Sequence, residues 1–484
     1  MLSFKYLLTI TCLLFYLLPI NISAQEWSEP VNISNTEFVE YSPDITITQD
    51  NIIHVVWSHK IETNYTKIYY SNSNDFGSTW SLPADISLND EFECGNAHIL
   101  HDSENNLFVS YEYDLGNPSQ TKIILRIYYG SNWSDIIGVT DTMPGSDHSL
   151  MSIDKEDRLY VFWAYQDDKF YYKYYQNEIW SDVYLPFGTN GPYFINECVC
   201  DLSNNIHCIG SSVNPTLYYE NITYYFYDFS SSIWHEPDVL TENVLYVGND
   251  IDLNSNGEPN LVWRERTNST PPYNDGTFYS VLSYNNWSIP ELIVEDPWDQ
   301  RIIIDKNENV NIFNREKTPY GSQLVHYLNY GSLWEGSIID TSVYLTKTPQ
   351  VSEINDELFV TYAKSHPSGD FADIWISKSD IYTGTYEAKY KKNSFNNIKM
   401  YPNPFEQTIT FDFSLIREGN MSIYISDLYG NLVIKLLDEY KLPGKHEVIW
   451  VGTDANGKLL KNGIYLVRLV AGKNVITKSV EILR

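Results

Sequence analysis

Short apolar runs recur along most of the chain, and an acidic or Asn-rich turn precedes each of them. The runs usually end in an aromatic residue, and their length and composition are typical of β-strands. They lie at 54–57, 108–111, 160–163, 207–210, 260–263, 311–314 and 359–362. The recurrence predicts a repeated β-structure.

A second pattern alternates with the first, namely a Trp that opens a strand and is usually followed by Ser and Pro. It occurs at Trp27, Trp80, Trp133, Trp180, Trp234, Trp287 and Trp334. The two patterns share a period of roughly 40–55 residues, which is typical of propeller blades and of solenoid repeats. Each unit has the pattern of four short strands of alternating polarity, which is the content of one blade.

The order of the two patterns at the chain ends separates a propeller from a solenoid. Residues 26–30 carry an outer-strand Trp before any inner strand, whereas the last unit, 351–380, has inner strands and no such outer strand after them. An N-terminal strand that completes the last blade removes the exposed sheet edges of an open array. We therefore predict an all-β protein in which residues 25–380 form a seven-bladed β-propeller closed by its N-terminal strand. Two separate β-sandwiches are the alternative.

One expected turn, at 73–80, carries a distinctive set of side chains. It combines a carboxylate that can bond the turn's backbone, a glycine for a positive φ and a large ring. The residues are Ser73, Asp75, Gly77, Thr79 and Trp80. Their spelling resembles the Asp-box (BNR repeat) of sialidase-like β-propellers, which implies that fold, with the box on the face opposite the active site. The box is intact only in the first unit.

The chain changes character after residue 380. Residues 381–399 are rich in Lys, Asn and Ser and lack apolar periodicity, so we predict a linker. Residues 400–484 alternate strand-like runs with Gly-marked turns, which predicts a small immunoglobulin-like β-sandwich. Four motifs in this region resemble, in order, those of the C-terminal sorting domain of type IX secretion cargo. They are Tyr-Pro-Asn-Pro-Phe, Asp-Leu-Tyr-Gly, Trp-x-Gly-x-Asp-x-x-Gly and Asn-Gly-Ile-Tyr.

This resemblance implies export across an outer membrane, with the type IX secretion machinery as a partner. It also implies removal of the domain, with release of the protein or its attachment to surface glycolipid. An accessory immunoglobulin-like module is the alternative reading of residues 400–484.

The start of the chain has the pattern of a secretory signal peptide over residues 1–24. Lys5 precedes an apolar stretch at 7–20, and small residues at 22–24 offer a cleavage site. A membrane anchor is disfavoured because the apolar core is short and no second span follows. We therefore expect an extracellular or outer cell-surface location and no transmembrane segment once the leader is removed.

The amino-acid composition limits the classes of molecule that the protein is expected to bind. Aromatic residues make up 15% of the 484 residues, which favours β-structure, and the net charge of −31 argues against nucleic acid as a partner. The excess acid lies in the expected propeller, whereas the expected sandwich is nearly neutral. Because no Asp-x-Asp-x-Asp-Gly loop is present, we predict no metal site, and we predict no cofactor.

Four cysteines remain after leader removal, namely Cys94, Cys198, Cys200 and Cys208. Cys200 and Cys208 flank an expected tight turn at 201–205, so a cross-strand disulfide between them fits an oxidising compartment. Free buried thiols are an equal alternative, and a metal site is disfavoured because no histidines stand at ligand spacing.

Ligands of such propellers bind at the mouth of the central channel, where the innermost strands begin and the second strands end. Alignment of the units places four candidates for catalysis near the starts of innermost strands: Asp44, His98, His148 and Asp250. Five candidates for ligand binding lie at the same mouth: Arg264, Arg266, Arg301, Arg315 and Lys364. Guanidinium groups suit carboxylates and sulfates, so an acidic sugar is the favoured ligand. The alternative is that the arginines form ion pairs with Glu265, Glu316 and Asp299.

The chain departs from the sialidase pattern at the first blade. It has Tyr41-Ser42-Pro43-Asp44 there and no Arg, and its arginines do not match the family's triad residue by residue. We therefore predict a secreted or cell-surface propeller that binds a glycan without sialidase chemistry. A polysaccharide lyase or glycoside hydrolase of sialidase-like fold is one alternative, with Arg301 and either His98 or His148 in its site. A protein-interaction platform is another.

Overall fold

A computed structural model describes most of the chain and shows only strands as regular elements within the described residues. The described residues are 27–62, 65–87, 93–116, 120–165, 169–187, 194–213, 220–244, 247–266, 275–283, 285–295, 297–318, 321–329, 334–341, 349–366, 371–379, 395–415, 419–427, 432–442, 444–455, 457–471 and 474–484. The predicted signal peptide and most of the predicted linker lie outside them. The all-β class is confirmed.

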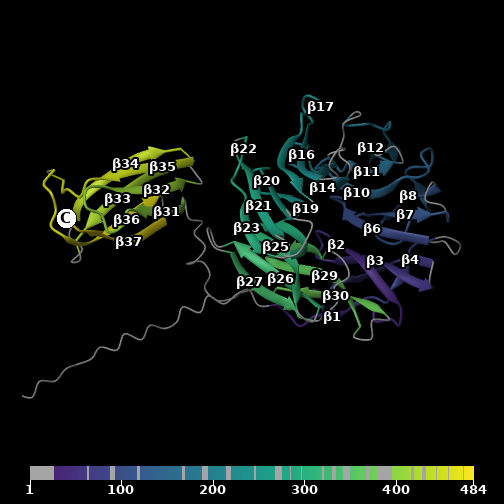
Figure 1. The fold of residues 1–484 in the computed structure, drawn as a ribbon. Helices are drawn as coiled ribbons and strands as arrows, with labels where there is room; N and C mark the ends of the chain where they lie inside the picture. The colour runs from purple at the N-terminus through teal and green to yellow at the C-terminus, as the bar shows by residue number, and fades with distance from the viewer. Residues whose placement is uncertain are drawn as a thin grey trace, which may run out of the picture.

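Before residue 380, antiparallel strands that are consecutive in the chain form small sheets (Figure 1). We call each set of consecutive strands a group and number the groups in chain order. Group 2 comprises β6 (Glu93–His101), β7 (Leu107–Asp114), β8 (Lys122–Tyr128) and β9 (Ile137–Gly138). Group 3 comprises β10 (Asp147–Ile153), β11 (Leu159–Tyr165), β12 (Lys169–Gln176) and β13 (Ile179–Trp180). Group 6 comprises β24 (Pro297–Ile304), β25 (Val310–Thr318), β26 (Gly321–Asn329) and β27 (Trp334–Asp340).

Two further sheets contain an additional outer strand. Group 4 comprises β14 (Phe194–Cys200), β15 (Ile206–Val213), β16 (Glu220–Asp228), β17 (Ile233–Trp234) and β18 (Asp238–Val244). Group 5 comprises β19 (Val247–Leu253), β20 (Pro259–Arg266), β21 (Asp275–Ser283), β22 (Asn286–Trp287) and β23 (Glu291–Glu295).

The first and last strands of this region share one eight-stranded sheet. Group 1 comprises β2 (Val39–Ile47), β3 (Ile53–Glu62), β4 (Tyr65–Ser73) and β5 (Ala84–Asp85). Group 7 comprises β28 (Gln350–Ile354), β29 (Glu357–Ser365), β30 (Ala372–Lys378) and β1 (Val31–Asn32). β1 pairs antiparallel with β30, with Val31 opposite Ile376. A single parallel bridge between Val39 and Ala372 links the two groups.

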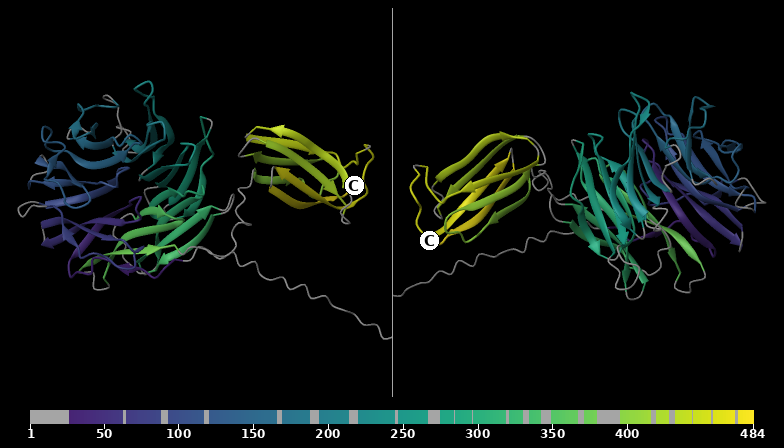
Figure 2. Two further views of the ribbon diagram at one scale, coloured as in Figure 1. Left: turned by 180° about the vertical axis from the view of Figure 1, so that it is seen from behind. Right: turned by 45° about the horizontal axis from the view of Figure 1, so that its top comes forward.

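The first strands of the groups contact one another in sequence. β2 contacts β6, β6 contacts β10, and the contacts continue through β14, β19 and β24 to β28, which contacts β2. The views from two further directions show the same succession of sheets around a common centre (Figure 2). Within the described residues no single sheet closes on itself, so the ring is made by contacts between sheets.

Hydrophobic cores fill the space between neighbouring groups. Trp57 of β3 lies in a core with Phe359 of β29, and Trp163 and Trp263 hold the corresponding places in other groups. The three indole rings are fully or almost fully buried, so they are part of these cores and offer no face to a ligand.

The acidic turns of the first pattern stabilise the hairpins between first and second strands. The carboxylate of Asp102 accepts the backbone N–H groups of Glu104 and Asn106, at 3.0 and 2.8 Å. Asp154, Asp201 and Asp305 bond their own turns in the same way. Asp is favoured here because its short side chain reaches the backbone two and four residues further on.

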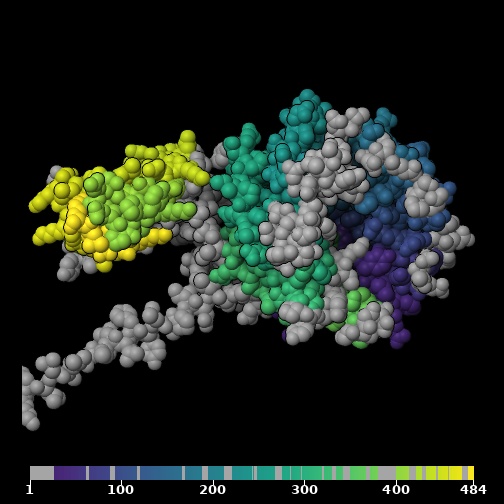
Figure 3. Space-filling model, viewed as in Figure 1, coloured from purple at the N-terminus to yellow at the C-terminus, as the bar shows by residue number. Residues whose placement is uncertain are grey.

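The C-terminal strands form a sandwich of two sheets, seen as one body in the space-filling view (Figure 3). One sheet contains β31 (Phe395–Tyr401), β32 (Ile409–Leu415) and β35 (Gly444–Trp450). The other contains β33 (Gly419–Ser426), β34 (Leu432–Lys441), β36 (Gly463–Ala471) and β37 (Asn474–Ile482). Trp450 lies in the core and donates to the carbonyl of Thr453 at 3.0 Å, which explains the Trp of the sequence motif.

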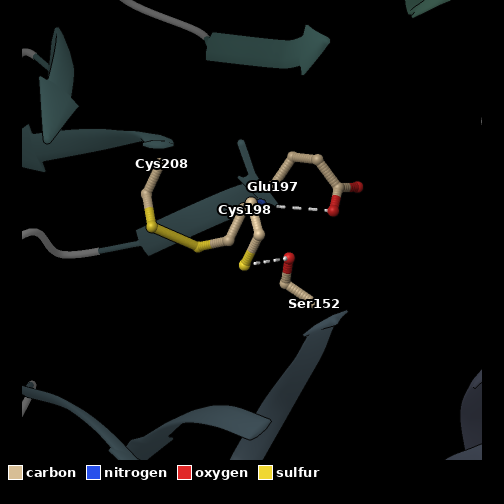
Figure 4. The surroundings of a disulfide bond; sticks show 5 residues. Ser152, Glu197, Cys198 and Cys208 are labelled. Atoms are coloured by element: carbon tan, nitrogen blue, oxygen red, sulfur yellow. Dashed lines mark hydrogen bonds between the residues drawn. A yellow bond between two sulfur atoms is a disulfide. The ribbon is translucent and has the colours of Figure 1, made fainter. Parts of the chain in front are cut away.

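The disulfide differs from the pair expected from the turn. The bond joins Cys198 to Cys208 (Figure 4). Cys200 is a free thiol that contacts Ser152 Oγ at 3.2 Å. The expectation of Cys200–Cys208 is wrong because the hairpin register sets Cys198 opposite Cys208 and Cys200 opposite Ile206. Cys94 is a free, buried thiol.

Candidate functional site

The first strands of five groups have a register shift toward the end where they begin, which we call the mouth, and three of these shifts form bulges with a residue at positive φ. The register shifts between Tyr41 and Asp44, between Gly95 and His98, and between Asp147 and Leu150. Each bulge holds one non-Gly residue at positive φ: Ser42 at 52°, Asn96 at 50° and His148 at 51°. Bulges redirect side chains, and such backbone strain is concentrated at functional sites.

Several charged side chains from different first strands meet inside the ring near the mouth. Arg301 of β24 lies 3.1 Å from Asp250 of β19 and 3.4 Å from Glu197 of β14, measured from its Nη1 atom. Because β19 lies between β14 and β24, the side chains of Arg301 and Glu197 meet across an intervening strand. On the other side, His98 Nδ1 lies 3.6 Å from Asp44 Oδ2. We call these five residues the channel cluster.

The structure therefore brings together three of the four predicted catalytic candidates and one predicted ligand-binding arginine. His98 and Glu197 remain partly exposed, at 27% and 24% of their side-chain surface, so a ligand can reach them. His148, the fourth candidate, is 55% exposed and lies 3.0 Å from Asp147. Among the described residues, no group of three His, Cys, Asp or Glu side chains has the geometry of a metal site.

Asp44 and Asp250 also hold the backbone of the neighbouring first strand. Asp44 Oδ2 accepts the N–H of Ile99 at 2.9 Å, and Asp250 Oδ2 accepts that of Ile302 at 2.8 Å. Asp252, two residues further along β19, makes the same kind of contact and accepts the N–H of Ile304 at 2.7 Å. These carboxylates have a structural role that the sequence did not reveal.

Burial changes the proton affinity of the cluster. It raises the pKa of Glu197 to about 7, although Arg301 opposes the shift, and it raises the pKa of Asp250 against the same opposition. Burial lowers the pKa of His98, but the Asp44 carboxylate outweighs this effect and the pKa is raised. Shifted pKa values with such specific charge partners are frequent in functional sites.

Glu197 was not among the predicted residues. It lies within a first strand directly after a register shift, as His98 does in β6, so the repeat contained the necessary signal. The irregular register between Ile195 and Glu197 obscured the alignment of this unit. Figure 4 shows Glu197 pointing away from the neighbouring disulfide, with the N–H of Cys198 donating to its carboxylate at 3.2 Å.

The remaining predicted ligand-binding residues are engaged in ion pairs. Arg264 and Arg266 both bind the buried carboxylate of Asp275, each at 2.7 Å. The sequence did not indicate this partner. Arg315 lies 2.5 Å from Asp299, which was an expected partner.

An indole ring that the sequence analysis overlooked lies beside Arg315. The guanidinium carbon of Arg315 lies 4.4 Å from the ring centre of Trp298, and Lys317 Nζ lies 5.7 Å from it. We call these three residues the Trp298 platform. A ring flanked by cations is suited to an anionic sugar, because the sugar can contact the ring and the charges together.

Lys364 lies in a separate cavity of about 370 Å³ between groups 6 and 7. Its Nζ is 3.2 Å from Asp340 and 4.5 Å from the ring centre of Trp375, and both residues line the cavity. Glu29 lines the cavity as well.

Among the buried side chains that have a polar atom without a hydrogen-bond partner in the described chain, five lie in first strands near the mouth. They are Ser42, Ser149, Asn196, Asn249 and Gln300. Unpaired buried polar groups are costly, so they mark a place where a polar molecule gains hydrogen bonds.

The turn at 73–80 is held by its own side chains. Asp75 accepts the N–H and the hydroxyl of Thr79 at 2.8 and 2.6 Å, and Ser73 Oγ accepts the N–H of Gly77 at 2.9 Å. These bonds lower the pKa of Asp75. Because β4 begins at the mouth and ends at Ser73, the turn lies at the opposite end of its group from the channel cluster.

Comparison with known proteins identifies the C-terminal region. Residues 399–482 match the family described as a secretion system C-terminal sorting domain, which confirms the sorting domain predicted there. No curated protein matches the chain. The described part of the chain contains no helix that is long and apolar enough to span a membrane.

Solved structures with a similar fold include three carbohydrate-active proteins. One is an ulvan lyase of a polysaccharide lyase family (TM-score 0.48, 11% identity, 72% of this chain and 93% of that one). Another is an α-L-arabinofuranosidase of Fusarium graminearum (0.45, 13%, 73% and 97%). The third is a Hadza microbial sialidase (0.43, 10%, 70% and 65%).

Proposed function

We propose that the chain is a secreted or surface-located seven-bladed β-propeller that binds an acidic glycan at its mouth. The sequence of contacts from β2 to β28 and back supports seven blades around one channel. The pairing of β1 with β30 supports closure of the last blade by the N-terminal strand. Deletion of residues 26–35 should then cause unfolding or aggregation, and a soluble product that unfolds cooperatively would contradict the closure.

Export is the second part of the proposal. The match at residues 399–482 supports sorting by a secretion system, and the motifs of that region favour the type IX machinery as the partner. We place the chain on the outer cell surface or outside the cell, after cleavage of a signal peptide at residues 1–24. A version that ends at Ser379 should stay inside the cells, as measured by fractionation. Its efficient appearance outside would contradict this role of the C-terminal region.

Glycan binding rests on the channel cluster, in which charged groups from five first strands converge and two of them, His98 and Glu197, stay partly exposed. We assign ligand contacts to Arg301 in the cluster, to Arg315 in the Trp298 platform and, around them, to Arg264, Arg266 and Lys364. The unpaired polar atoms at the strand starts favour a ligand rich in hydroxyl groups.

The affinity of such a site follows from a few contacts. A charge-assisted hydrogen bond contributes roughly 1–3 kcal/mol, so several of them with one aromatic contact give micromolar binding. The interaction is mainly electrostatic, and added salt should weaken it.

A glycan array that includes acidic polysaccharides tests the proposal. The parent protein should bind acidic glycans, and replacing both Arg301 and Arg315 by Ala should abolish binding. Lys306, which is 52% exposed and pairs with Asp356, supplies the control, because Lys306→Ala removes a cation far from the mouth. Equal binding by the double variant and the parent would place the site elsewhere. Binding to no glycan at all would favour a protein-interaction platform.

A carbohydrate lyase or hydrolase is the second candidate function. The observation that favours it is Glu197, a partly exposed carboxyl whose pKa of about 7 suits proton transfer, near His98 and Arg301. Chromatography of a bound polysaccharide after incubation separates the two functions. Shorter products favour the enzyme, and an unchanged polysaccharide favours the binding protein.

A further inference from the structure

Arg301 has two carboxylate partners, and the structure holds them very differently. Asp250 is almost completely buried, lies 3.1 Å from Arg301 and uses its other oxygen to accept the N–H of Ile302. Glu197 lies at 3.4 Å, which is long for a charge-assisted bond, and about a quarter of its side chain is exposed. Asp250 is therefore a fixed part of the fold, and Glu197 is the partner that can leave.

We propose that a carboxylate of the ligand replaces Glu197 at Arg301, and that the displaced Glu197 takes up one proton from solvent. This exchange rests on the proposed function, because it assumes an acidic glycan at the mouth. Although Arg301 is already paired in the free protein, the exchange costs no ion pair, since the pair with the ligand replaces the pair with Glu197. Uptake of the proton keeps the total charge of the site constant.

The charges around Glu197 favour the exchange. Facing it are Arg301 of β24, Asp250 of β19 and His98 of β6, with Asp44 of β2 behind the histidine. Further along the channel, the pKa of Asp252 is raised by burial to about 7. A second ionised carboxylate beside Asp250 is unfavourable once Arg301 has turned to the ligand, so Glu197 becomes neutral.

The sign of the pH dependence follows from linkage. Arg301 is the main influence that lowers the pKa of Glu197 in the free protein, so loss of this contact raises the pKa in the complex above about 7. Binding therefore has full strength below the pKa of the free protein. It weakens as the pH rises from that value to the pKa of the complex, by about tenfold for each pH unit.

Calorimetry of the mature protein with tetragalacturonate tests the exchange, and the methyl ester of the same sugar supplies a probe without charge. Titrations between pH 5.5 and 8.5, in buffers of different ionisation enthalpy, give the affinity and the number of protons taken up. For the acid we expect uptake of about half a proton at the pKa of the free protein, rising toward one proton about one pH unit above it, and we expect none for the ester.

Two isosteric variants separate Glu197 from its surroundings. E197Q should bind tetragalacturonate at least as tightly as the parent at pH 8, with a flat pH profile and no proton uptake from this residue. E316Q is the matched control, because Glu316 bonds Tyr327 and Gln323 on β26, and it should retain the parent's profile. Thermal melting at each pH verifies that every variant is folded.

The outcomes distinguish the exchange from the proposed function. Tight binding with a flat profile in the parent, or unchanged proton uptake in E197Q, overturns the exchange and leaves glycan binding intact. Unchanged uptake in E197Q means that another group of the channel, such as His98 or Asp252, takes up the proton. No binding of the acid at any pH overturns both.

Discussion

Asp44 Oδ2 accepts the backbone N–H of Ile99 at 2.9 Å, so the first strand of group 1 holds the first strand of group 2 through a side chain. Asp250 and Ile302 repeat this relationship between groups 5 and 6. Sheets that meet only through side chains have no ladder of backbone hydrogen bonds between them, and these carboxylates supply individual bonds in its place.

Replacing Asp44 by Asn should destabilise the part of the protein that groups 1 to 7 form. The Asp44 carboxylate also accepts the N–H of Ile45, and an amide has only one oxygen for two N–H groups. The expected loss is about 1–3 kcal/mol in the free energy of unfolding, measured with urea. Asp147→Asn is the control, because Asp147 is half exposed and its change should be close to zero. Equal stability of both variants would contradict a structural role for Asp44.

The repeat, the strands and the sorting domain were accessible from the sequence because they depend on local patterns. Trp450 and the acidic turns such as Asp102 have short-range partners, so their spacing alone indicates their role. The channel cluster was only partly accessible, because it depends on which strands face one another across the ring. Glu197 was missed because the register shift beside it displaces the alignment by one residue.

The ion pairs of the arginines show the same limit. Asp299 follows Trp298 in a strand that pairs with β25, so its contact with Arg315 was foreseeable. Asp275 lies opposite Arg266 in the next strand, beyond a connection whose length the pattern does not define. Such ion pairs depend on which residues of two neighbouring strands lie opposite one another, and the secondary-structure propensities of the residues do not determine this.

Gly77→Ala should cost about 1–2 kcal/mol, because Gly77 has a φ of +79°, which L-residues with a Cβ adopt at a cost. Space is not the cause, since the nearest atom to an added Cβ would be 3.7 Å away, on Phe359. Gly95→Ala is the matched control, with no positive φ and no atom within 4 Å. Urea midpoints of the two variants should separate; identical midpoints would show that the turn tolerates the strain.

The disulfide should be traceable by peptide mapping. Cleavage before Asp201 separates Cys208 from Cys198 and Cys200, and fragmentation of the linked peptides should place the bond at Cys198. The bridge encloses a short loop, so replacing both Cys198 and Cys208 by Ala should remove about 2–3 kcal/mol of stability. A link from Cys200 to Cys208 would show that the hairpin has another register.

Arg484 and Gly452 should be energetically coupled. The Arg484 guanidinium donates to the carbonyls of Glu406, Leu460 and Val451, at 2.8, 3.0 and 2.7 Å, which ties three segments of the sandwich together. A Cβ at Gly452 would meet this guanidinium, and the φ of +70° adds strain.

A double-mutant cycle measures this coupling. Arg484→Ala should cost about 1–2 kcal/mol, since it removes hydrogen bonds from a charged donor at an exposed site. Gly452→Ala should cost less when Arg484 is already absent. Strict additivity of the two losses would show that the arginine does not occupy the place beside Gly452.

The pairing of Val31 with Ile376 has a consequence for the order of events during synthesis. The strand that leaves the ribosome first waits for a partner that is made more than 300 residues later, about the separation over which Trp27 bonds Ser337. Contacts between such distant segments form slowly, because the intervening chain must first be brought together. The last group can therefore be completed only after β30 has been made, and β1 is without this strand as a partner until then.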